Sequence, residues 1–268
     1  STAIANHEKI MVYGDYDVDG TTSVALVFSY LTTYYPDCIY YIPDRYEEGY
    51  GISKKGIDYA KEQVISLIIA LDCGIKALDN TTYAKEMGID FIICDHHLPG
   101  ADLPEAVAIL NPKQNNCNYP FKDLCGCGIG FKLIEALTQE RGLSFEMILP
   151  YIDLVAMAIA ADIVPILGEN RILTYYGLAQ IRKNPREGIK LFVTGIKREL
   201  NVTDLVFVIA PRLNAAGRIK HGSLAVELLL SNDPTEALSR GRAIELFNSE
   251  RQVLDQHITE QALDQIVE

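Results

Sequence analysis

Three aspartates at alternate positions are the residues of this sequence best placed to do chemistry. Asp15, Asp17 and Asp19 lie in the segment DYDVDG, which ends at Gly20. Carboxylates crowded into one turn repel one another, and a hard divalent cation, which prefers clustered oxygen ligands, relieves that repulsion. Capping of a following helix is the alternative for one aspartate such as Asp19, but it does not account for three. We therefore predict a metal site at this turn.

Further carboxylates and two imidazoles follow apolar segments elsewhere in the chain. One apolar run ends at Asp72, and a second apolar segment ends at Asp162. A third run leads directly into Asp95, His96 and His97. A histidine in a loop is commonly an ordinary surface residue, and an aspartate there can cap a turn, so each residue alone is weak support. Their shared position at the ends of apolar runs predicts one polar cluster.

Carboxylates combined with one or two imidazoles fit Mn²⁺ or Mg²⁺ better than zinc, which draws on cysteine. We predict two divalent cations, with Mn²⁺ preferred and Mg²⁺ as the alternative, bridged by Asp72 and hydrolysing a phosphoester. Adjacent histidines point to opposite sides, so we expect His96 to bind metal and His97 to donate to a phosphate or leaving oxygen. The predicted catalytic residues are His97, Asp72 and Asp95. Zinc binding is disfavoured because the cysteines include no Cys-x-x-Cys pair.

The elements that would position these aspartates and histidines are predicted from short apolar runs that alternate with helical patterns. Near-continuous apolar runs of this kind predict strands of a parallel sheet with helices on both faces, a doubly wound α/β fold. The carboxyl ends of parallel strands lie on one edge of a sheet, which lets the polar groups converge. The predicted strands are 10–13, 38–42, 64–71, 89–94 and 107–110, and the predicted helices begin near residue 21 or span 54–63 and 76–87.

The second half of the chain reads as helical. A glycine-rich segment at residues 124–130 precedes a helix, which favours either a close approach of the backbone to another element or to a phosphate, or simple helix packing. An irregular polar stretch is expected at residues 211–218. The other predicted helices are 131–141, 145–160, 171–183, 187–198, 203–209, 223–230 and a long helix from about residue 235 to the end.

We expect three regions: an α/β metal-binding domain at residues 1–165, a helical extension with a phosphate-binding segment at 166–232, and a connector helix at 233–268. The last helix carries an apolar stripe and lacks a helix-ending signal. We therefore expect the chain to be a piece of a longer protein, cut inside a connector to a further domain. A terminal helix packed on its own domain is the alternative.

Composition excludes two classes of protein. With 24 Lys and Arg against 36 Asp and Glu, the net charge of −12 argues against a protein that coats nucleic acid by bulk charge, although it permits a local basic groove. No apolar run reaches the length of a membrane span. Most of the six cysteines lie inside apolar runs, which is typical of buried thiols and predicts a cytoplasmic protein.

Six short motifs stand in order along nearly the whole chain: DYDVDG (15–20), LDCG (71–74), DHH (95–97), CGIGFK (127–132), DIVP (162–165) and RLNAAGR (212–218). Together they resemble the DHH phosphoesterase superfamily and, within it, the RecJ single-stranded-DNA exonucleases. The aspartate-rich first motif and the last motif look like RecJ rather than the pyrophosphatase or oligonucleotide-phosphatase branches. Six spaced motifs are far more specific than any one of them.

The resemblance implies roles for particular residues. His97 matches the family's substrate-facing histidine, and Asp15 matches a ligand or a group behind the ligands. The family's metal ligands match Asp17, Asp19, Asp72, His96 and Asp162. Its region that binds DNA phosphates matches Arg45, Arg212, Asn214 and Arg218, and guanidinium groups suit that task.

The resemblance also implies a two-metal 5′-to-3′ exonuclease that degrades single-stranded DNA to mononucleotides in repair and recombination. It implies a second domain, called DHHA1, following the connector, and a single-strand-binding protein or a helicase as partners. One alternative is a phosphodiesterase for oligonucleotides or cyclic dinucleotides. A non-catalytic replication scaffold of the same fold is another, and the loss of ligands that would mark a scaffold is not seen here.

Overall fold

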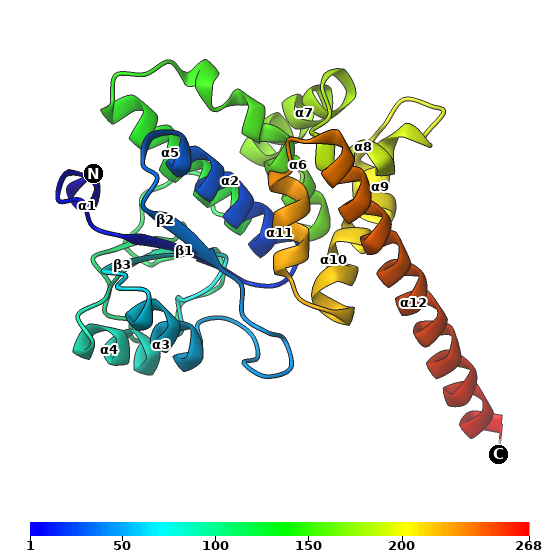
Figure 1. Ribbon diagram of the computed structural model, residues 1–268, viewed down its shortest axis with the longest axis horizontal. Helices are drawn as coiled ribbons and strands as arrows, with labels where there is room; N and C mark the ends of the chain where they lie inside the picture. The colour runs from blue at the N-terminus through cyan, green and yellow to red at the C-terminus, as the bar shows by residue number, and fades with distance from the viewer. Residues whose placement is uncertain (268) are drawn as a thin grey trace.

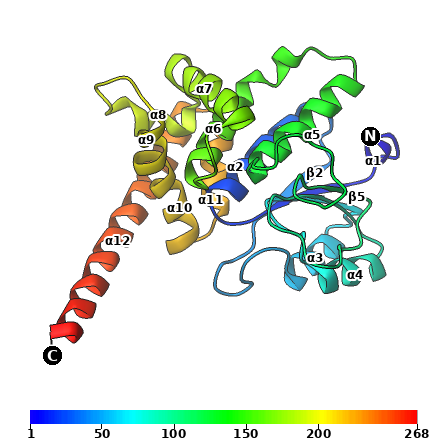
Figure 2. The ribbon, with the colours of Figure 1, turned by 180° about the vertical axis from the view of Figure 1, so that it is seen from behind.

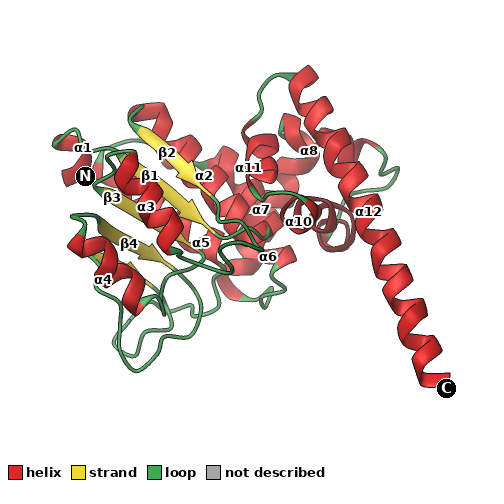
Figure 3. Ribbon diagram, turned by 60° about the horizontal axis from the view of Figure 1, so that its bottom comes forward, coloured by secondary structure: helices red, strands yellow, loops and turns green. Residues whose placement is uncertain are grey.

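The computed structural model describes residues 1–267, and its centre is a sheet of five parallel strands. The strand order is β2-β1-β3-β4-β5, and every neighbouring pair is parallel. Figure 3 shows the strands running in one direction, with their carboxyl ends facing the helical part of the molecule. The strands are β1 (Ile10–Gly14), β2 (Cys38–Tyr41), β3 (Leu67–Leu71), β4 (Asp90–Cys94) and β5 (Ala108–Leu110).

Helices cover both faces of this sheet, which confirms the predicted doubly wound α/β fold. α2 (Val18–Tyr34) and α5 (Gly126–Glu140) lie over one face, whereas α3 (Lys54–Glu62) and α4 (Leu78–Glu86) lie over the other (Figure 1). Figure 2 shows the same layers from behind. A short helix, α1 (Thr2–Ala5), precedes the sheet.

The alternation of side chains along β1 explains why two separate cores form. Ile10 and Val12 join the core under α2 and α5, while Met11 and Tyr13 join the core under α3 and α4. Successive side chains of a strand point to opposite faces, so a central strand that is apolar throughout must be covered on both.

The helical part of the chain packs around α6 (Ile152–Ala161), which is buried along nearly its whole length. Two single turns of 3-10 helix precede α6, at Phe145–Met147 and Leu149–Tyr151. A buried carboxylate on this helix, Asp153, is paired with the guanidinium of Arg186 at 2.8 Å. The remaining helices of this part are α7 (Gly168–Lys183), α8 (Glu187–Thr194), α9 (Val202–Asp204), a π-helical turn at Leu205–Ile209, α10 (Ala210–Ile219) and α11 (Ser223–Leu230).

Four of the predicted elements differ from those in the structure. Residues 211–218, expected to be irregular, form most of α10, which continues directly from the π-helical turn at Leu205–Ile209 and packs its small residues in the interior. The helix expected at 145–160 is interrupted near Pro150, and the helix expected from residue 131 begins at Gly126. The third strand begins at Leu67 rather than residue 64, since Val64 has a left-handed backbone with φ of 60°.

The long helix α12 (Pro234–Val267) has two different halves. Its first half packs on α8 and α10 and buries Ala237, Ile244 and Asn248. Its second half projects from the body of the molecule and leaves Val253, Ile258 and other apolar side chains exposed (Figure 1). The predicted connector extends to residue 268, which lies outside the described residues. Among residues 1–267, no helix is both long enough and apolar enough to cross a membrane.

Candidate metal centre

The predicted polar groups gather at the carboxyl edge of the sheet. Asp15 follows β1, Asp72 follows β3, and Asp95 begins the loop after β4, while Asp162 ends α6. Because β1, β3 and β4 are neighbours in the sheet, their carboxyl ends bring these side chains together from separate segments of the chain.

Asp17 and Asp19 have different tasks in the acidic turn. Asp17, rather than Asp19, caps α2, because its Oδ1 accepts a hydrogen bond from the N–H of Gly20 at 3.0 Å. The carboxylate of Asp19 instead accepts hydrogen bonds from the main-chain N–H groups of Gly126 and Cys127, both at 2.7 Å. Asp19 therefore ties the acidic turn to the first turn of α5, where the helix dipole favours negative charge.

Asp72 is held in a backbone conformation that few residues adopt. Its φ is 59°, which is uncommon outside glycine, although aspartate and asparagine tolerate it better than most residues. A Cβ on Gly126 would lie 2.5 Å from the Cβ of Asp72, so α5 can approach this residue only through a glycine. Of the alternatives that the glycine-rich segment left open, the structure thus has a close approach of the backbone to another element.

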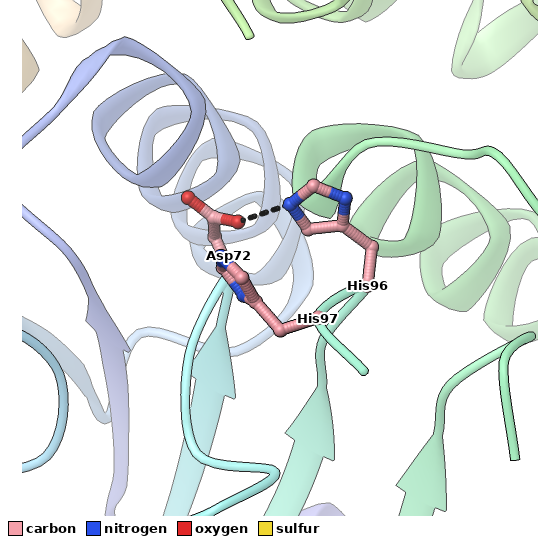
Figure 4. A group of neighbouring side chains, drawn as sticks. All are labelled: Asp72, His96 and His97. Carbon is pink, nitrogen blue, oxygen red and sulfur yellow. Dashed lines mark ion pairs between the residues drawn. The ribbon is translucent and has the colours of Figure 1, made fainter. Parts of the chain in front are cut away.

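His96 lies at the centre of the cluster. Its Nε2 is 3.1 Å from Asp72 Oδ1, 3.6 Å from Asp162 Oδ2 and 3.8 Å from Asp19 Oδ2. Figure 4 shows the imidazole of His96 pointing at Asp72. Two groups therefore have donor atoms within 4.8 Å of one another: Asp72, His96 and His97, and Asp19, His96 and Asp162.

The hydrogen bonding of these atoms fits a bound cation. Both ring nitrogens of His96, Oδ1 of Asp72 and both carboxylate oxygens of Asp15 are buried without a hydrogen-bond partner among residues 1–267. The 3.1 Å approach of His96 to Asp72 is thus a contact between two potential ligand atoms without hydrogen-bond geometry. Unsatisfied buried polar atoms are costly, and divalent cations shared among them would remove the cost. The donors present, carboxylates with one imidazole, suit Mn²⁺ or Mg²⁺.

The electrostatics of the cluster show the same need for positive charge. Burial, together with the charge of Asp17, raises the pKa of Asp15 to about 7. Burial and the same charge raise the pKa of Asp162 to about 6. Burial and neighbouring carboxylates also raise the pKa values of Asp19 and Asp72. Burial lowers the pKa of His96 to about 4, which leaves its imidazole neutral near pH 7, the form that binds metals.

His97 has a different environment from His96. Its Nδ1 lies 2.7 Å from Asp95 Oδ1, and Asp95 also accepts hydrogen bonds from the main-chain N–H groups of His97 and Ile75. Although burial opposes ionisation of Asp95, these hydrogen bonds hold its pKa below the usual value. The hydrogen bond to Asp95 raises the pKa of His97. Asp95 therefore orients His97, and the histidine is the member of the pair placed to meet a substrate.

Two of the predicted phosphate-binding residues lie free at the rim of the centre. Arg45 is exposed and stacks on the ring of Tyr16, with its Cζ 5.1 Å from the ring centroid. Arg218 is exposed at the end of α10, and its positive charge acts against the burial that raises the pKa of Asp17. Neither arginine has an ion pair within residues 1–267. Both guanidinium groups are available to an anion.

The other two predicted phosphate-binding residues are engaged in structural contacts. Arg212 is bonded to Glu245 of α12 at 2.7 Å and to the carbonyl of Val208 at 2.6 Å. Oδ1 of Asn214 accepts a hydrogen bond from the N–H of Val18 at 3.1 Å, which fixes the start of α2. These contacts place Arg212 as a link between helices and Asn214 as a support for the acidic turn.

Sequence reasoning missed two residues near the centre. The hydroxyl of Tyr50 lies 3.3 Å from Nε2 of His97 and 3.2 Å from the carbonyl oxygen of Asp72. The charge of Lys113 opposes the rise in the pKa of Asp162 and adds to the lowering of the pKa of His96. Tyr50 stands between two glycines, a signal of a special loop conformation, whereas nothing in the local sequence distinguishes Lys113 from other surface lysines.

Known proteins match nearly the whole length of this chain. The chain is 43% identical over 267 residues to the single-stranded-DNA-specific exonuclease RecJ of Bacillus subtilis strain 168, covering 98% of this chain and 33% of that protein. It is 38% identical over 269 residues to RecJ of Escherichia coli K12, covering 95% and 47%. The chain therefore spans a third to about half the length of these two relatives.

Solved structures agree with the sequence matches. A crystal structure of exonuclease RecJ bound to manganese is 32% identical, has a TM-score of 0.89, and is matched over 98% of this chain and 67% of its own. RecJ of Thermus thermophilus in complex with Mn²⁺ is 30% identical, has a TM-score of 0.87, and is matched over 98% and 38%. The sequence model of the DHH family, N-terminal domain, matches residues 9–159, which include nearly all of the cluster. The chain belongs to the DHH family.

Proposed function

We propose that this chain forms the metal-dependent catalytic part of an exonuclease that hydrolyses single-stranded DNA to mononucleotides. The convergence of Asp19, Asp72, His96 and Asp162, with the ring nitrogens of His96 and Oδ1 of Asp72 buried without a hydrogen bond among residues 1–267, carries the proposal. Relatives that share most of this chain are single-stranded-DNA-specific exonucleases by name, which supports the choice of substrate.

The residues of the centre divide the work between holding cations and handling the substrate. Asp17, Asp19, Asp72, His96 and Asp162 would hold two divalent cations, with Mn²⁺ preferred, and Asp15, whose buried carboxylate oxygens have no hydrogen bond among residues 1–267, is a further ligand or a charge behind them. Such cations, when bound, supply an activated water and neutralise the charge of the phosphate. Arg45 and Arg218 are free to hold phosphate oxygens of the strand.

His97 is the group of the chain placed to manage a proton. Asp95 fixes Nδ1, which leaves Nε2, 3.3 Å from the hydroxyl of Tyr50, as the nitrogen that can exchange a proton. The proton on Nδ1 is assigned from this hydrogen bond, since a carboxylate can only accept. His97 then holds or donates a proton at the oxygen that leaves the phosphate, a role whose loss commonly costs a factor of about 10² to 10⁴ in rate.

A nuclease assay with Mn²⁺ and end-labelled oligonucleotides tests the proposal. We expect mononucleotides from single-stranded DNA, little product from a blunt duplex, and loss of activity in Asp72→Asn. Release of label from the 5′ end first would support the predicted 5′-to-3′ polarity. Faster cleavage of dinucleotides than of long strands would favour the alternative of an oligonucleotide phosphodiesterase, and a metal-bound chain without hydrolytic activity would favour a scaffold.

Several sequence predictions stay predictions. They are the division at residues 165 and 232, a cytoplasmic location, a role in repair and recombination, and partnership with a single-strand-binding protein or a helicase.

A further inference from the structure

Tyr50 contacts two parts of the centre through its hydroxyl group. The hydroxyl lies 3.2 Å from the main-chain carbonyl of Asp72 and 3.3 Å from Nε2 of His97. The ring of Tyr50 also meets the ring of His97 edge to face, with centroids 5.9 Å apart. One tyrosine therefore connects the main chain of Asp72, which carries the proposed bridging carboxylate, with the proposed proton-handling histidine.

Packing does not explain why a tyrosine stands at this position. The residue is 53% exposed, so its ring gains little from burial. Its hydroxyl, by contrast, contacts both the carbonyl oxygen of Asp72 and Nε2 of His97. A phenol both donates and accepts, so it can donate to the Asp72 carbonyl while it accepts from His97, or donate to His97 when that nitrogen is unprotonated.

The loop that carries Tyr50 is built to present it. Gly49 and Gly51 flank the tyrosine with φ of 80° and 84°, a left-handed conformation that other residues rarely adopt. The same loop is tied down on either side of Tyr50: the hydroxyl of Tyr46 donates to the carbonyl of Arg218 at 2.7 Å, and the hydroxyl of Tyr13 donates to the carbonyl of Gly51 at 2.8 Å. The conformation of the two glycines thus fixes where the phenol ring points.

His97 would be held at one nitrogen only without this contact. Asp95 fixes Nδ1, but a single hydrogen bond leaves the ring free to tilt about it. The hydroxyl of Tyr50 supplies the second fixed point, and it also restrains the strained main chain of Asp72, whose φ is 59°. Both ends of this connection matter for the reaction proposed above.

We propose that Tyr50 is a positioning residue that sets the imidazole of His97 relative to Asp72, and so aligns the proton-handling group with the metal-bound phosphate. This inference rests on the proposed nuclease function. It differs from that function in making Tyr50 act through His97, without touching the cations itself.

Steady-state kinetics on a single-stranded oligonucleotide test the proposal. Tyr50→Phe removes one hydroxyl and should lower kcat about tenfold with KM changed less than about twofold, since one hydrogen bond is lost and DNA contacts remain. Tyr83→Phe is the matched control, because its hydroxyl bonds to Asp58 on the outer surface of α3 and α4, and it should retain the parent kcat. In a His97→Ala background, Tyr50→Phe should have no further effect.

A spectroscopic measurement keeps the test independent of activity. The imidazole ¹⁵N resonances of the metal-free chain, assigned to His97 by their loss in His97→Ala, should shift at Nε2 in Tyr50→Phe and stay in place in Tyr46→Phe. Tyr46 is in the same loop but bonds to Arg218 instead, so the comparison separates loss of the contact from loosening of the loop.

The possible results separate this inference from the proposed function. A shifted Nε2 resonance in a chain that cleaves no DNA would support the contact and overturn the nuclease proposal. An unchanged resonance together with parent kcat in Tyr50→Phe would overturn the inference alone. Additive losses in Tyr50→Phe and His97→Ala would also overturn it, since Tyr50 would then act without His97.

Discussion

Nε2 of His96 lies 3.1 Å from Oδ1 of Asp72, and neither atom has a hydrogen bond within residues 1–267. Both atoms are buried at the point where three neighbouring strands end. Buried polar atoms are nearly always satisfied, so a pair of this kind is suited to bind a shared third partner. A divalent cation is the partner that suits a carboxylate beside a neutral imidazole.

Removing divalent metal should destabilise the chain. A ligand at about 100 times its Kd stabilises the folded state by about 2.7 kcal/mol. For a chain of this size, we expect roughly a 5 °C rise in Tm when Mn²⁺ is added to chelator-treated protein. Differential scanning fluorimetry measures this rise, and Asp72→Asn should reduce it strongly. An equal rise in the parent and in Asp72→Asn would place the ion elsewhere.

The stability of the metal-free chain should fall as pH rises from about 5 to about 8. The pKa values of Asp15 and Asp162 are raised to about 7 and about 6, so in this range the folded chain binds more protons than the unfolded chain. The stabilisation is present below about pH 4 and is lost as pH rises through the folded pKa values. His96, with its pKa lowered to about 4, opposes this trend below about pH 6.5, but it is one group against several carboxylates.

Denaturant unfolding at several pH values checks the direction of this change. Mn²⁺ should reverse it, since ionised carboxylates bind the cation more tightly as pH rises. Metal-free protein that gains stability between about pH 5 and pH 8 would contradict the raised pKa values.

The two adjacent histidines should have separable defects. His96→Ala removes a ligand atom that approaches three carboxylates, so isothermal titration calorimetry should show Mn²⁺ affinity reduced by at least about tenfold. His97→Ala should bind Mn²⁺ nearly as the parent does and lose kcat by about 10² or more. Loss of metal binding in both variants would show that His97 is also a ligand.

Two glycines of α5 provide a matched pair. Gly126→Ala would place a Cβ 2.5 Å from the Cβ of Asp72, so the helix or the aspartate must move. The nearest atoms to a Cβ on Gly128 are at 3.4 Å, an ordinary contact. We expect Gly126→Ala to lose Mn²⁺ binding and about 1–3 kcal/mol of stability, the usual cost of overpacking, and Gly128→Ala to keep both. Urea unfolding and calorimetry on the two variants check this, and equal behaviour would contradict the close approach.

Sequence patterns were sufficient to predict the architecture and the gathering of the acidic residues and His96 at one edge of the sheet. Apolar runs that end in aspartate or histidine place those residues at one edge of a parallel sheet, and Asp15, Asp72 and His96 are found there. Sequence patterns did not predict the role of a residue where that role depends on tertiary contacts. The cap of α2 is Asp17, because Asp19 is recruited by the N–H groups of Gly126 and Cys127, 107 and 108 residues away.

The basic residues show the same limit. The sequence around an arginine does not show whether its guanidinium group forms an ion pair or is exposed to solvent. Among residues 1–267, Arg218 is exposed without an ion pair, while Arg212 lies against Glu245 of α12, and only the packing of α10 on α12 distinguishes them. Tyr50 was missed for a related reason, since its importance comes from contacts with Asp72 and His97 rather than from its own neighbours in sequence.

The location of manganese in crystals of the chain tests the central claim most directly. Anomalous diffraction from crystals grown with Mn²⁺ should show its strongest peaks between Asp72, His96, Asp19 and Asp162, with Nε2 of His96 and a carboxylate oxygen of Asp72 as ligands. Peaks confined to other surfaces, with none beside these side chains, would contradict the account.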